Sequence, residues 1–411
     1  MMQENGFRET EIGLIPCDWA IRRISEIARI KYGKQKPKNE GRYSVIGSSG
    51  IYAYSDVPLI DFETLIVGRK GNAGTVQLTL GPCWPADTTF YLEWLSEDVN
   101  VQFLYYFMSA HRLSGEHAKT TLPSIQRQDL ENYLFPVPSI QEQSKIVMLM
   151  GKLQQAIEQQ EQIIAKTKEL KRSLMHRLFT YGLRGEELKE TEIGLMPESW
   201  NLVSIGELIA NKVLFIQNGF PCGKWNDKGI GILQLRPFNI SDEGYIDLNT
   251  VKHIQTDKKI DSYLLRNEDV IFNNTNSEKL VGKTALWQAE KEAVLSNHMT
   301  IIRISKKDKL VPLYLARLLH KKWFDKYFRS ICQRHVNQAS VGVERIKGVR
   351  LGLPSIAEQK EIASVFYQLD QKICNENIKK MNLESFFKSM LQLLMTGQVR
   401  VKDIDFGEDY E

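Results

Sequence analysis

Apolar residues recur every three or four positions in two long stretches of the chain, from Ser139 to Thr180 and from Ser355 to Thr396. This is the period of an amphipathic α-helix. Ser139 and Ser355 are expected N-caps, each with a glutamate three residues later in a capping-box pattern. Both stretches end at a glycine, Gly182 and Gly397, which can adopt the left-handed conformation that closes a helix.

The two stretches have matching apolar seams at an offset of 216 residues. The first predicted seam is Ile146, Leu149, Leu153, Ala156, Gln160, Ile163, Thr167, Leu170 and Leu174. The second is Ile362, Val365, Leu369, Lys372, Glu376, Lys379, Leu383, Phe386 and Met390. A helix of about 42 residues is about 63 Å long and cannot bury its seam alone, so we expect the two helices to form a coiled coil.

Two shorter echoes frame these helices. ETEIGLIPCDW, residues 9 to 19, returns as ETEIGLMPESW, residues 190 to 200, and we call this the opening signature. PSIQEQ, residues 138 to 143, returns as PSIAEQ, residues 354 to 359, and we call this the closing signature. The offsets are 181 and 216, so the interior of the second copy is 216 − 181 = 35 residues longer. The chain is therefore predicted to contain two modules with one frame and different contents.

The direction of the helices follows from the short link between them. Only residues 183 to 189 separate the end of the first helix from the second opening signature. A domain of ~150 residues is about 40 Å across and cannot return the chain over about 63 Å to start a parallel partner. We therefore expect an antiparallel pair with pseudo-two-fold symmetry and one globular domain at each end.

The globular parts have the pattern of mixed α+β domains. In the first, strands are predicted at 43–46, 51–54, 64–68, 75–79 and 89–94, and a helix at 101–113. In the second, strands are predicted at 232–235, 269–273, 283–287 and 300–304, and a helix at 310–330. The expected division is 1–137, a first domain; 138–182, a helix; 183–353, a second domain; 354–397, a helix; and 398–411, an acidic tail.

Composition indicates a cytoplasmic protein. The chain is 42% hydrophobic and 25% charged, and its longest apolar run, Ile146 to Met150, is far too short to cross a membrane. The N-terminal MMQENGF lacks the apolar core of a signal peptide. The cysteines are odd in number and widely spaced, which favours reduced, structural thiols over disulfides or zinc.

The net charge of +4 conceals two basic runs. Residues 303 to 350 contain thirteen Lys and Arg against three acids, and residues 22 to 42 contain eight against two. Solvated faces explain many such runs. A basic run in each module, interleaved with Trp323, Phe324, Tyr327 and Phe328 in the second, also fits a surface that binds duplex DNA.

Motifs for catalysis fail on inspection. There is no Pro-Pro for an adenine methyltransferase loop, and Ser277 stands where a phosphate-binding loop ending in Gly282-Lys283-Thr284 would need its first glycine. The glycines of GRKGNAG, residues 68 to 74, predict a tight turn that either approaches DNA phosphate or is purely structural. The histidines show no metal-ligand spacing, so we expect neither a catalytic residue nor a metal.

The paired signatures and the helix ends SLMHRLFT and SMLQLLMT resemble the specificity subunit of type I restriction-modification systems over nearly the whole chain. The resemblance implies two target recognition domains held apart by an antiparallel coiled coil, each reading half of a split DNA site. It also implies two methyltransferase subunits and two restriction subunits as partners. S-adenosylmethionine, ATP and Mg would be bound by those partners, and this chain would need no cofactor.

Base reading requires side chains that present donors and acceptors to a groove. The candidates come from one segment after a mid-domain strand and one before the closing signature in each module. They are Arg69, Lys70, Asn72, Thr120, Thr121, Ser124, Gln126, Arg127, Asn273, Asn274, Asn276, Ser277, Lys279, Lys321, Lys322, Arg334, Asn337 and Gln338. A plain polar loop is the alternative for each of them. For the whole chain, the alternatives are a coiled-coil adaptor that never contacts DNA and a stand-alone enzyme acting on DNA.

Overall fold

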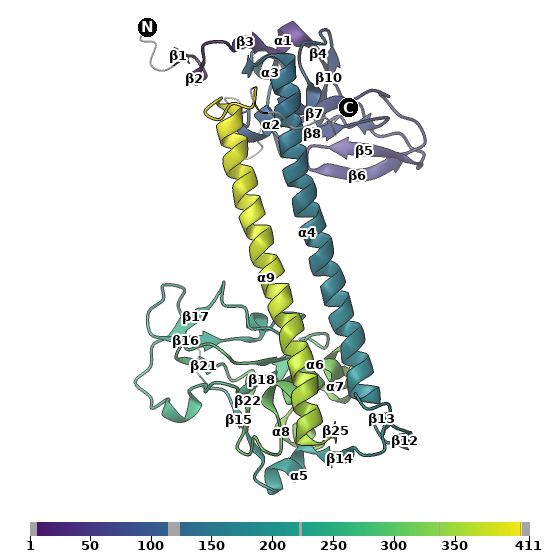
Figure 1. The fold of residues 1–411 in the computed structure, drawn as a ribbon, viewed down its shortest axis with the longest axis vertical. Helices are drawn as coiled ribbons and strands as arrows, with labels where there is room; N and C mark the ends of the chain where they lie inside the picture. The colour runs from purple at the N-terminus through teal and green to yellow at the C-terminus, as the bar shows by residue number, and fades with distance from the viewer. Residues whose placement is uncertain (1–5, 114–123, 222–223, 337, 403, 405–411) are drawn as a thin grey trace. The chain divides into compact units, whose positions relative to one another are not determined.

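The computed structural model describes residues 6–113, 124–221, 224–336, 338–402 and 404. It divides into two compact units: unit 1 comprises Met1–Glu161 and Ile378–Glu411, and unit 2 comprises Gln162–Asn377. Two long helices, α4 (Ile140–Tyr181) and α9 (Ile356–Met395), are shared by the units (Figure 1). About half of each helix belongs to unit 1 and the other half to unit 2. The compact units therefore cut across the expected boundaries, because each includes part of the helix pair.

The helices are antiparallel, as the contacts inside each unit show. In unit 1, Ile146 and Met150 near the start of α4 share a core with Leu394 and Met395 at the end of α9. In unit 2, the end of α4 meets the start of α9, where Phe179 stacks on Phe366 with ring centroids 5.5 Å apart. The predicted coiled-coil pairing and its direction are confirmed.

The predicted seams are wrong at several positions. Ile163, Leu170 and Phe386 are 42%, 50% and 51% exposed, whereas the next residues, Ile164, Lys171 and Phe387, face inward. The spacing between seam positions is thus four and then three, not three and then four. The two choices lie on adjacent faces of an α-helix, and apolar residues occur on both, so the periodicity alone did not separate them.

Unit 1 has a sheet of four antiparallel strands in the order β4-β10-β7-β8 and a smaller sheet β6-β5-β9, in which β5 and β9 are parallel. Two-stranded pairs β1-β2 and β11-β3 complete it. Its elements are β1 (Phe7–Thr10), β2 (Gly13–Pro16), β3 (Ala20–Arg23), α1 (Ile24–Ile27), β4 (Ala28–Tyr32), β5 (Tyr43–Gly47), β6 (Gly50–Ser55), β7 (Thr64–Gly68), β8 (Val76–Thr79), β9 (Trp84–Pro85), β10 (Thr89–Trp94), α2 (Val101–Ala110), α3 (Arg127–Glu131) and β11 (Leu134–Val137).

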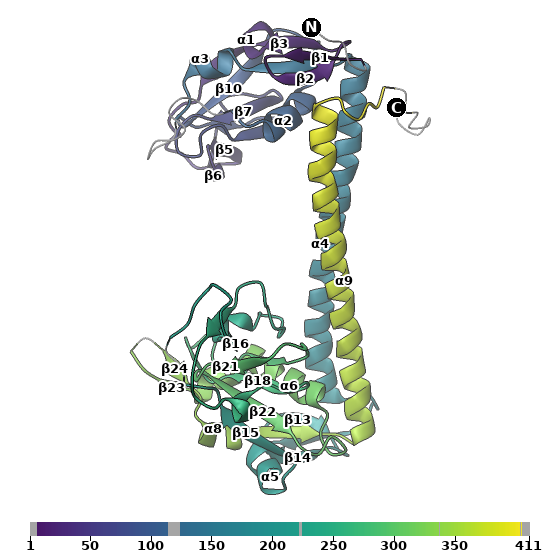
Figure 2. The ribbon, with the colours of Figure 1, turned by 90° about the vertical axis from the view of Figure 1, so that its left-hand side faces the viewer.

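Unit 2 repeats this plan. Its four-stranded sheet is β15-β22-β18-β20, and its smaller sheet is β17-β16-β21, in which β16 and β21 are again parallel. A further sheet, β19-β24-β23, lies on the side of unit 2 away from the long helices (Figure 2). The elements are β12 (Leu188–Thr191), β13 (Gly194–Pro197), β14 (Asn201–Ser204), α5 (Ile205–Ala210), β15 (Leu214–Asn218), β16 (Ile232–Leu235), η1 (Pro237–Asn239), β17 (Lys252–Ile254), η2 (Asp261–Tyr263), β18 (Val270–Asn273), β19 (Thr275–Asn276), β20 (Thr284–Leu286), β21 (Ala293–Leu295), β22 (Met299–Ile304), α6 (Pro312–Phe324), α7 (Tyr327–Ile331), β23 (Gln333–Arg334), β24 (Ala339–Ser340), α8 (Val343–Lys347) and β25 (Arg350–Leu353).

The mixed α+β class and the predicted strands are confirmed, but the helix predicted at 310–330 is wrong. It is two helices, α6 and α7, broken where Lys326 adopts a left-handed conformation with φ 60°. The break turns Phe328 into the core, edge-on to Phe272 with ring centroids 4.9 Å apart.

The opening signature is a β-hairpin followed by a buried tryptophan. Gly13 and Gly194 have φ of 101° and 97° at the hairpin turns, where only glycine is free of strain. The threonine three residues earlier donates to each glycine carbonyl, at 2.6 Å from Thr10 and 2.7 Å from Thr191. The turn chemistry accounts for the repeated Thr-x-x-Gly of this signature.

The closing signature ties each domain to the start of a long helix through its glutamine. Gln143 accepts a bond from the backbone N–H of Asn100, which caps α2, at 2.8 Å. Gln359 accepts the equivalent bond from Val311, which caps α6, at 3.0 Å. Each glutamine also donates to two backbone carbonyls, those of Asp98 and Pro138 or of Lys309 and Pro354.

The side chain of the closing-signature glutamate makes tertiary contacts, whereas its backbone N–H is capped by the serine. Ser139 and Ser355 accept bonds from the N–H groups of Glu142 and Glu358, as predicted for N-caps. The Glu142 carboxylate, however, accepts a bond from the Trp19 indole at 3.1 Å and faces Arg400. Glu358 accepts a bond from the backbone of Leu183 at 2.8 Å. The two signatures of the first module thus meet in space, and the closing signature of the second module contacts the end of the first long helix.

Candidate nucleic-acid interface

In unit 1, the two candidate segments lie side by side. Lys70, just after β7, forms an isolated antiparallel bridge with Ser124, and the N–H of Ile125 donates to the Arg69 carbonyl at 2.9 Å. Lys70, Asn72, Gln126 and Arg127 are exposed. Segments more than 50 residues apart in sequence therefore present their polar side chains together.

Local bonds shape this first interface. Arg112 donates to the Asn72 side chain and to the Ala73 carbonyl, both at 2.8 Å. The Arg69 guanidinium lies 5.2 Å from the ring centre of Tyr32, a half-exposed aromatic residue. Arg112 and Tyr32 were not predicted, because they come from other elements and no sequence motif includes them.

The glycines of the 68–74 turn have a structural explanation. A Cβ on Gly68 would lie 2.4 Å from the Asn72 carbonyl, and one on Gly74 would lie 2.2 Å from the Leu113 carbonyl. Gly71 and Gly74 also have positive φ, 76° and 75°. The turn needs glycine for its own backbone packing, whatever it contacts.

In unit 2, the corresponding segments pair as strands. β19, after β18, pairs with β24, and β24 pairs with β23. Ser277, Lys279, Arg334 and Gln338 are exposed around this small sheet. Arg334 forms an ion pair with Glu278 at 2.7 Å, so the two segments are also held together by charge.

Two candidates in this unit are buried. Asn273 has no exposed surface and donates to the Leu280 carbonyl at 3.0 Å. Asn274 is 8% exposed and donates to the Thr300 hydroxyl at 2.8 Å. Both side chains are interior and donate their amide N–H to the fold, which corrects their assignment to base contact. Thr120, Thr121 and Asn337 lie outside the described residues.

Beside this sheet is a hollow of about 570 Å³. Its lining includes Asn276, Ser277 and Gln338 together with Lys283, His298 and the half-exposed ring of Phe238. Phe238 follows β16 in a connection that has no counterpart in unit 1. It was not predicted, because it lies far from the other lining residues in sequence.

The basic run of residues 303 to 350 is not a single surface. Arg303 bonds to Asp269 and Arg317 to Asp370, and both arginines are buried. Lys321 pairs with Asp325 at 2.6 Å, with 15% of its side chain exposed. Burial, and then the charge of Lys321, lower the pKa of Lys322 to about 8, and its ammonium lies 4.6 Å from the Tyr327 ring centre. The linear count of charges overstated what this surface presents to a polyanion.

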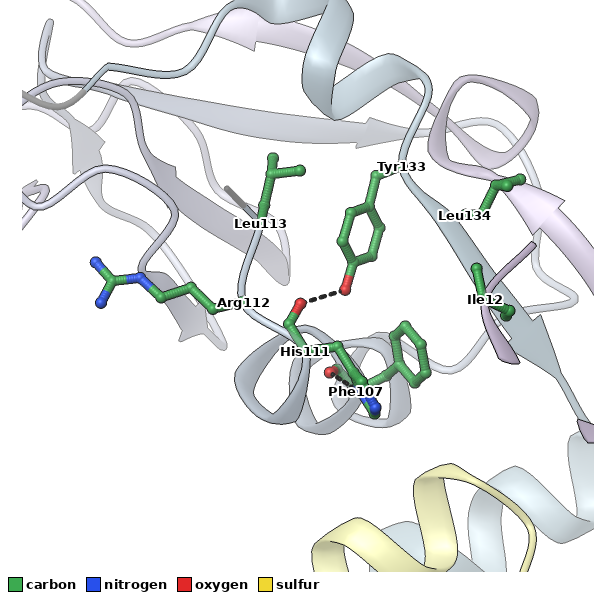
Figure 3. Close-up of a pocket in the computed structure, with 7 residues that line it drawn as sticks. All are labelled: Ile12, Phe107, His111, Arg112, Leu113, Tyr133 and Leu134. Carbon is green, nitrogen blue, oxygen red and sulfur yellow. Dashed lines mark hydrogen bonds between the residues drawn. The ribbon is translucent and has the colours of Figure 1, made fainter. Parts of the chain in front are cut away.

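A second hollow, of about 450 Å³, lies in unit 1 between the end of α2 and the start of β11. Figure 3 shows Phe107, Tyr133, Leu134 and Ile12 around it, with Arg112 directed away. Burial raises the pKa of Tyr133, so its hydroxyl stays protonated and donates to the His111 carbonyl at 2.6 Å. The Tyr133 hydroxyl, the one hydroxyl of this lining, is engaged by a backbone carbonyl, so the hollow offers no activated nucleophile.

The lysine of the phosphate-loop-like string is also engaged. Lys283 is buried and bonds to Asp242 and to the Ile240 carbonyl, so it cannot serve a nucleotide. Among the residues that the structure describes, no group of three His, Cys, Asp or Glu side chains is arranged to hold a metal ion. No helix in that part of the chain is long and apolar enough to cross a membrane.

Known proteins share both the sequence pattern and the fold. The chain is 23% identical to the type I restriction enzyme MjaVIII specificity subunit of Methanocaldococcus jannaschii over 98% of both chains. It is 31% identical to the putative type I restriction enzyme MjaX specificity subunit of that organism, over 52% of this chain and 49% of the relative. The crystal structure of the type I restriction-modification system S subunit from M. genitalium has the same fold, with a TM-score of 0.58 and 15% identity, covering 96% of this chain and 98% of that one.

A family model matches twice, once in each module. The model of the type I restriction modification DNA specificity domain covers residues 16–169 and 197–385, well over half of the chain. The two matches follow the two modules that the signatures delimit. The chain belongs to the family of type I restriction-modification DNA specificity proteins.

Proposed function

We propose that this chain is the non-catalytic DNA-recognition subunit of a type I restriction-modification complex, and that each of its two domains reads one half of a bipartite site. The observation that carries this proposal is the pairing of polar segments at corresponding places in both units. One segment follows β7 or β18, and the other precedes α3 or α8. The placement of these segments is the same in both units, whereas their side chains differ. Two domains that read different DNA sequences require this combination.

The reading residues of this proposal are those that remain exposed. In unit 1 they are Lys70, Asn72, Gln126 and Arg127; in unit 2 they are Ser277, Lys279, Arg334 and Gln338. Lysine and arginine side chains favour guanine, and asparagine and glutamine favour adenine.

The helices are proposed to set the unread spacer and to dock the partners. They carry exposed apolar side chains that neither unit buries, namely Ile163 and Leu170 on α4 and Tyr367, Ile378, Met381 and Phe386 on α9. Such side chains suit an interface with methyltransferase subunits. Those subunits and the restriction subunits would bind S-adenosylmethionine, ATP and Mg and perform the chemistry in the cytoplasm.

Methylation mapping tests the reading proposal. The full chain is assembled with its methyltransferase subunits, supplied with S-adenosylmethionine and DNA, and the methylated adenines are located. Arg334→Ala with Gln338→Ala should relax the second half-site about tenfold or more at the affected bases and leave the first unchanged. Asn72→Ala should do the reverse, and Lys347→Ala, which removes an exposed charge on α8, should do neither.

Three outcomes would contradict the proposal. Unaltered half-sites at wild-type rates would move the reading surface elsewhere. DNA affinity that is absent, or insensitive to salt, would favour an adaptor that never contacts DNA. Methyl transfer by the purified chain without partners would favour a stand-alone enzyme.

The spacer proposal predicts a length effect. One heptad added to each helix at the matched positions Gln160 and Glu376 lengthens the helix pair by about 10 Å. The unread spacer should then lengthen by up to about three base pairs while both half-sites stay the same. An active complex that retained its original spacer would show that the helix length does not set the spacer length.

A further inference from the structure

The largest insertion of the second module reaches the long helices. In unit 1 a tight hairpin, Gly47 to Gly50, joins β5 to β6. In unit 2 the corresponding connection, between β16 and β17, runs from residue 236 to residue 251. Within it, Ser241 and Tyr245 form a closed turn: the Ser241 N–H donates to the Tyr245 carbonyl at 2.9 Å, and the Tyr245 N–H donates to the Ser241 hydroxyl at 3.1 Å.

This turn is held by a cluster of buried charges that we name the ionic clamp: Lys171 of α4, Arg317 of α6 and Asp370 of α9. Figure 1 shows these three helices side by side in unit 2. The Tyr245 hydroxyl donates to Asp370 at 2.7 Å and accepts from Lys171 at 2.8 Å. Lys171 also pairs with Asp370 at 2.8 Å.

The backbone of the turn is bound as well. Lys171 donates to the Glu243 carbonyl at 3.1 Å, and Arg317 donates to the Gly244 carbonyl at 2.8 Å and pairs with Asp370. Gly244 has φ 77°, and a Cβ there would lie 2.9 Å from the Arg317 guanidinium. Outside the clamp, the Glu243 carboxylate pairs with Lys168 at 3.2 Å.

Unit 1 has aromatic rings at two of the three corresponding positions. With the offset of 216 between the two long helices, Phe387 is the residue of unit 1 equivalent to Lys171, and Gln154 is the one equivalent to Asp370. The residue numbers of the α2 and α6 caps, Asn100 and Val311, differ by 211, so Tyr106 is the residue of unit 1 equivalent to Arg317. Tyr106 and Phe387 meet edge to face, with ring centroids 6.3 Å apart. In unit 1 an aromatic contact therefore joins the domain helix α2 to the long helix α9 at the place where unit 2 has the ionic clamp.

Buried charges are costly, and apolar side chains of similar volume often stabilise a fold as well or better. Charges differ from apolar contacts in direction: a bonded ion cluster fixes one arrangement of the groups that form it, whereas an apolar contact tolerates sliding. In the clamp, side-chain exposure is 3% for Lys171, 3% for Arg317 and 12% for Asp370, so water barely competes for these bonds.

We propose that Lys171, Arg317 and Asp370 are positioning residues: by gripping the inserted turn, they fix the second recognition domain on the helix pair and narrow the range of spacer lengths that the complex accepts. This inference rests on the proposed function. It assigns the clamp no contact with DNA, and neither half-site depends on it.

Two variants test the clamp. Tyr245→Phe removes only the hydroxyl that joins Lys171 to Asp370. The graft Lys171→Phe, Arg317→Tyr and Asp370→Gln installs the residues of unit 1 and leaves Glu243 paired with Lys168. Lys347→Met is the control, because it removes a charge from α8 far from the turn in sequence. If the graft does not fold, Tyr245→Phe alone decides the test.

Each protein is assembled with its methyltransferase subunits. The complexes receive DNAs in which the wild-type half-sites are separated by spacers from two base pairs shorter to two longer than the mapped one. We expect the wild type and the control to prefer one spacer, and the clamp variants to raise relative methylation of neighbouring spacers about tenfold. Amide hydrogen exchange at 241–245 should accelerate in the same variants.

Unchanged spacer selectivity with accelerated exchange would show that the clamp is merely structural and would overturn the proposal. Unchanged exchange would overturn it too, because the turn would then be held by other groups. A wild-type complex with no bipartite site would instead refute the proposed function. The exchange measurement would then still show whether the clamp holds the 241–245 turn.

Discussion

The two recognition domains join the long helices through one contact that is the same in both and two that differ. The shared contact is the buried glutamine of the closing signature, which binds the cap of α2 through Gln143 and the cap of α6 through Gln359. Its geometry agrees within 0.2 Å between the copies, 2.8 Å against 3.0 Å. A duplicated frame has thus retained the contact that fixes where each domain helix starts.

The second contact has diverged in its charges. In unit 1, Arg400 bonds to both Glu142 and Asp18, and Glu142 also bonds to the Trp19 indole. In unit 2, the arginine at the matched position, Arg184, pairs with exposed Glu361 instead. The Trp200 indole is buried and has no hydrogen-bond partner among the described residues. Equivalent residues therefore stabilise one unit more than the other.

The third contact replaces the Tyr106–Phe387 pair of unit 1 with the ionic clamp of unit 2. The frame thus requires a filled contact between the domain helix and the long helix, not a particular chemistry. A module can therefore gain a new connection, such as the 236–251 insertion, without changing the rest of its frame.

The largest expected difference between the units lies at the matched arginines. Arg400→Met leaves Glu142, whose side chain is 2% exposed, without its cationic partner, so the free energy of unfolding should fall by about 3 kcal/mol. Arg184→Met removes a solvent-exposed pair and should change it little. Urea denaturation of the full chain measures both, and equal losses would contradict the asymmetry.

The shared glutamines should behave alike. Gln143→Ala and Gln359→Ala each leave backbone groups unpaired around a buried site, so each should lower the free energy of unfolding of its unit by about 2 to 3 kcal/mol. Amide hydrogen exchange in α2 and α6 reports the two units separately. A large loss of unfolding free energy in only one unit would show that the glutamine stabilises only one of the two copies.

A pH effect should be confined to unit 2. Burial, and then the charge of Arg317, lower the pKa of His320 to about 3, so the folded imidazole is neutral and unfolding at low pH takes up a proton. The stability that this histidine contributes is fully present above pH 6.5 and is lost as pH falls towards 3. At pH 5 the loss is about 2 kcal/mol relative to pH 7.5.

Ser109 holds the matched place in unit 1 and does not titrate in this range. His320→Gln should remove about 2 kcal/mol of the pH dependence of unit 2 unfolding between pH 7.5 and 5. Unit 1 serves as the internal reference in the same exchange experiment. An unaltered pH profile in the variant would mean that other groups govern the acid response.

Sequence patterns found the features that depend on local spacing. The helices, their caps, the closing glycines and the two-module frame follow from periodicity and repetition, and the chain order of the strands follows from alternation and turn residues. The same patterns misplaced several seam positions along both long helices and missed the break at Lys326. At the break a tertiary partner, the Phe272 ring, packs against Phe328.

The architecture follows from sequence patterns alone: two like domains, two long helices, their antiparallel pairing, and the segments that carry the candidate reading residues. Tertiary packing determines which of those candidates are exposed, that Asn273, Arg303 and Arg317 are interior, and that Phe238 and Tyr32 lie beside the candidate interfaces. Periodicity records which face of an element avoids water. It does not record which distant residue occupies that face, and the pairing of charges and the shape of a surface depend on that residue.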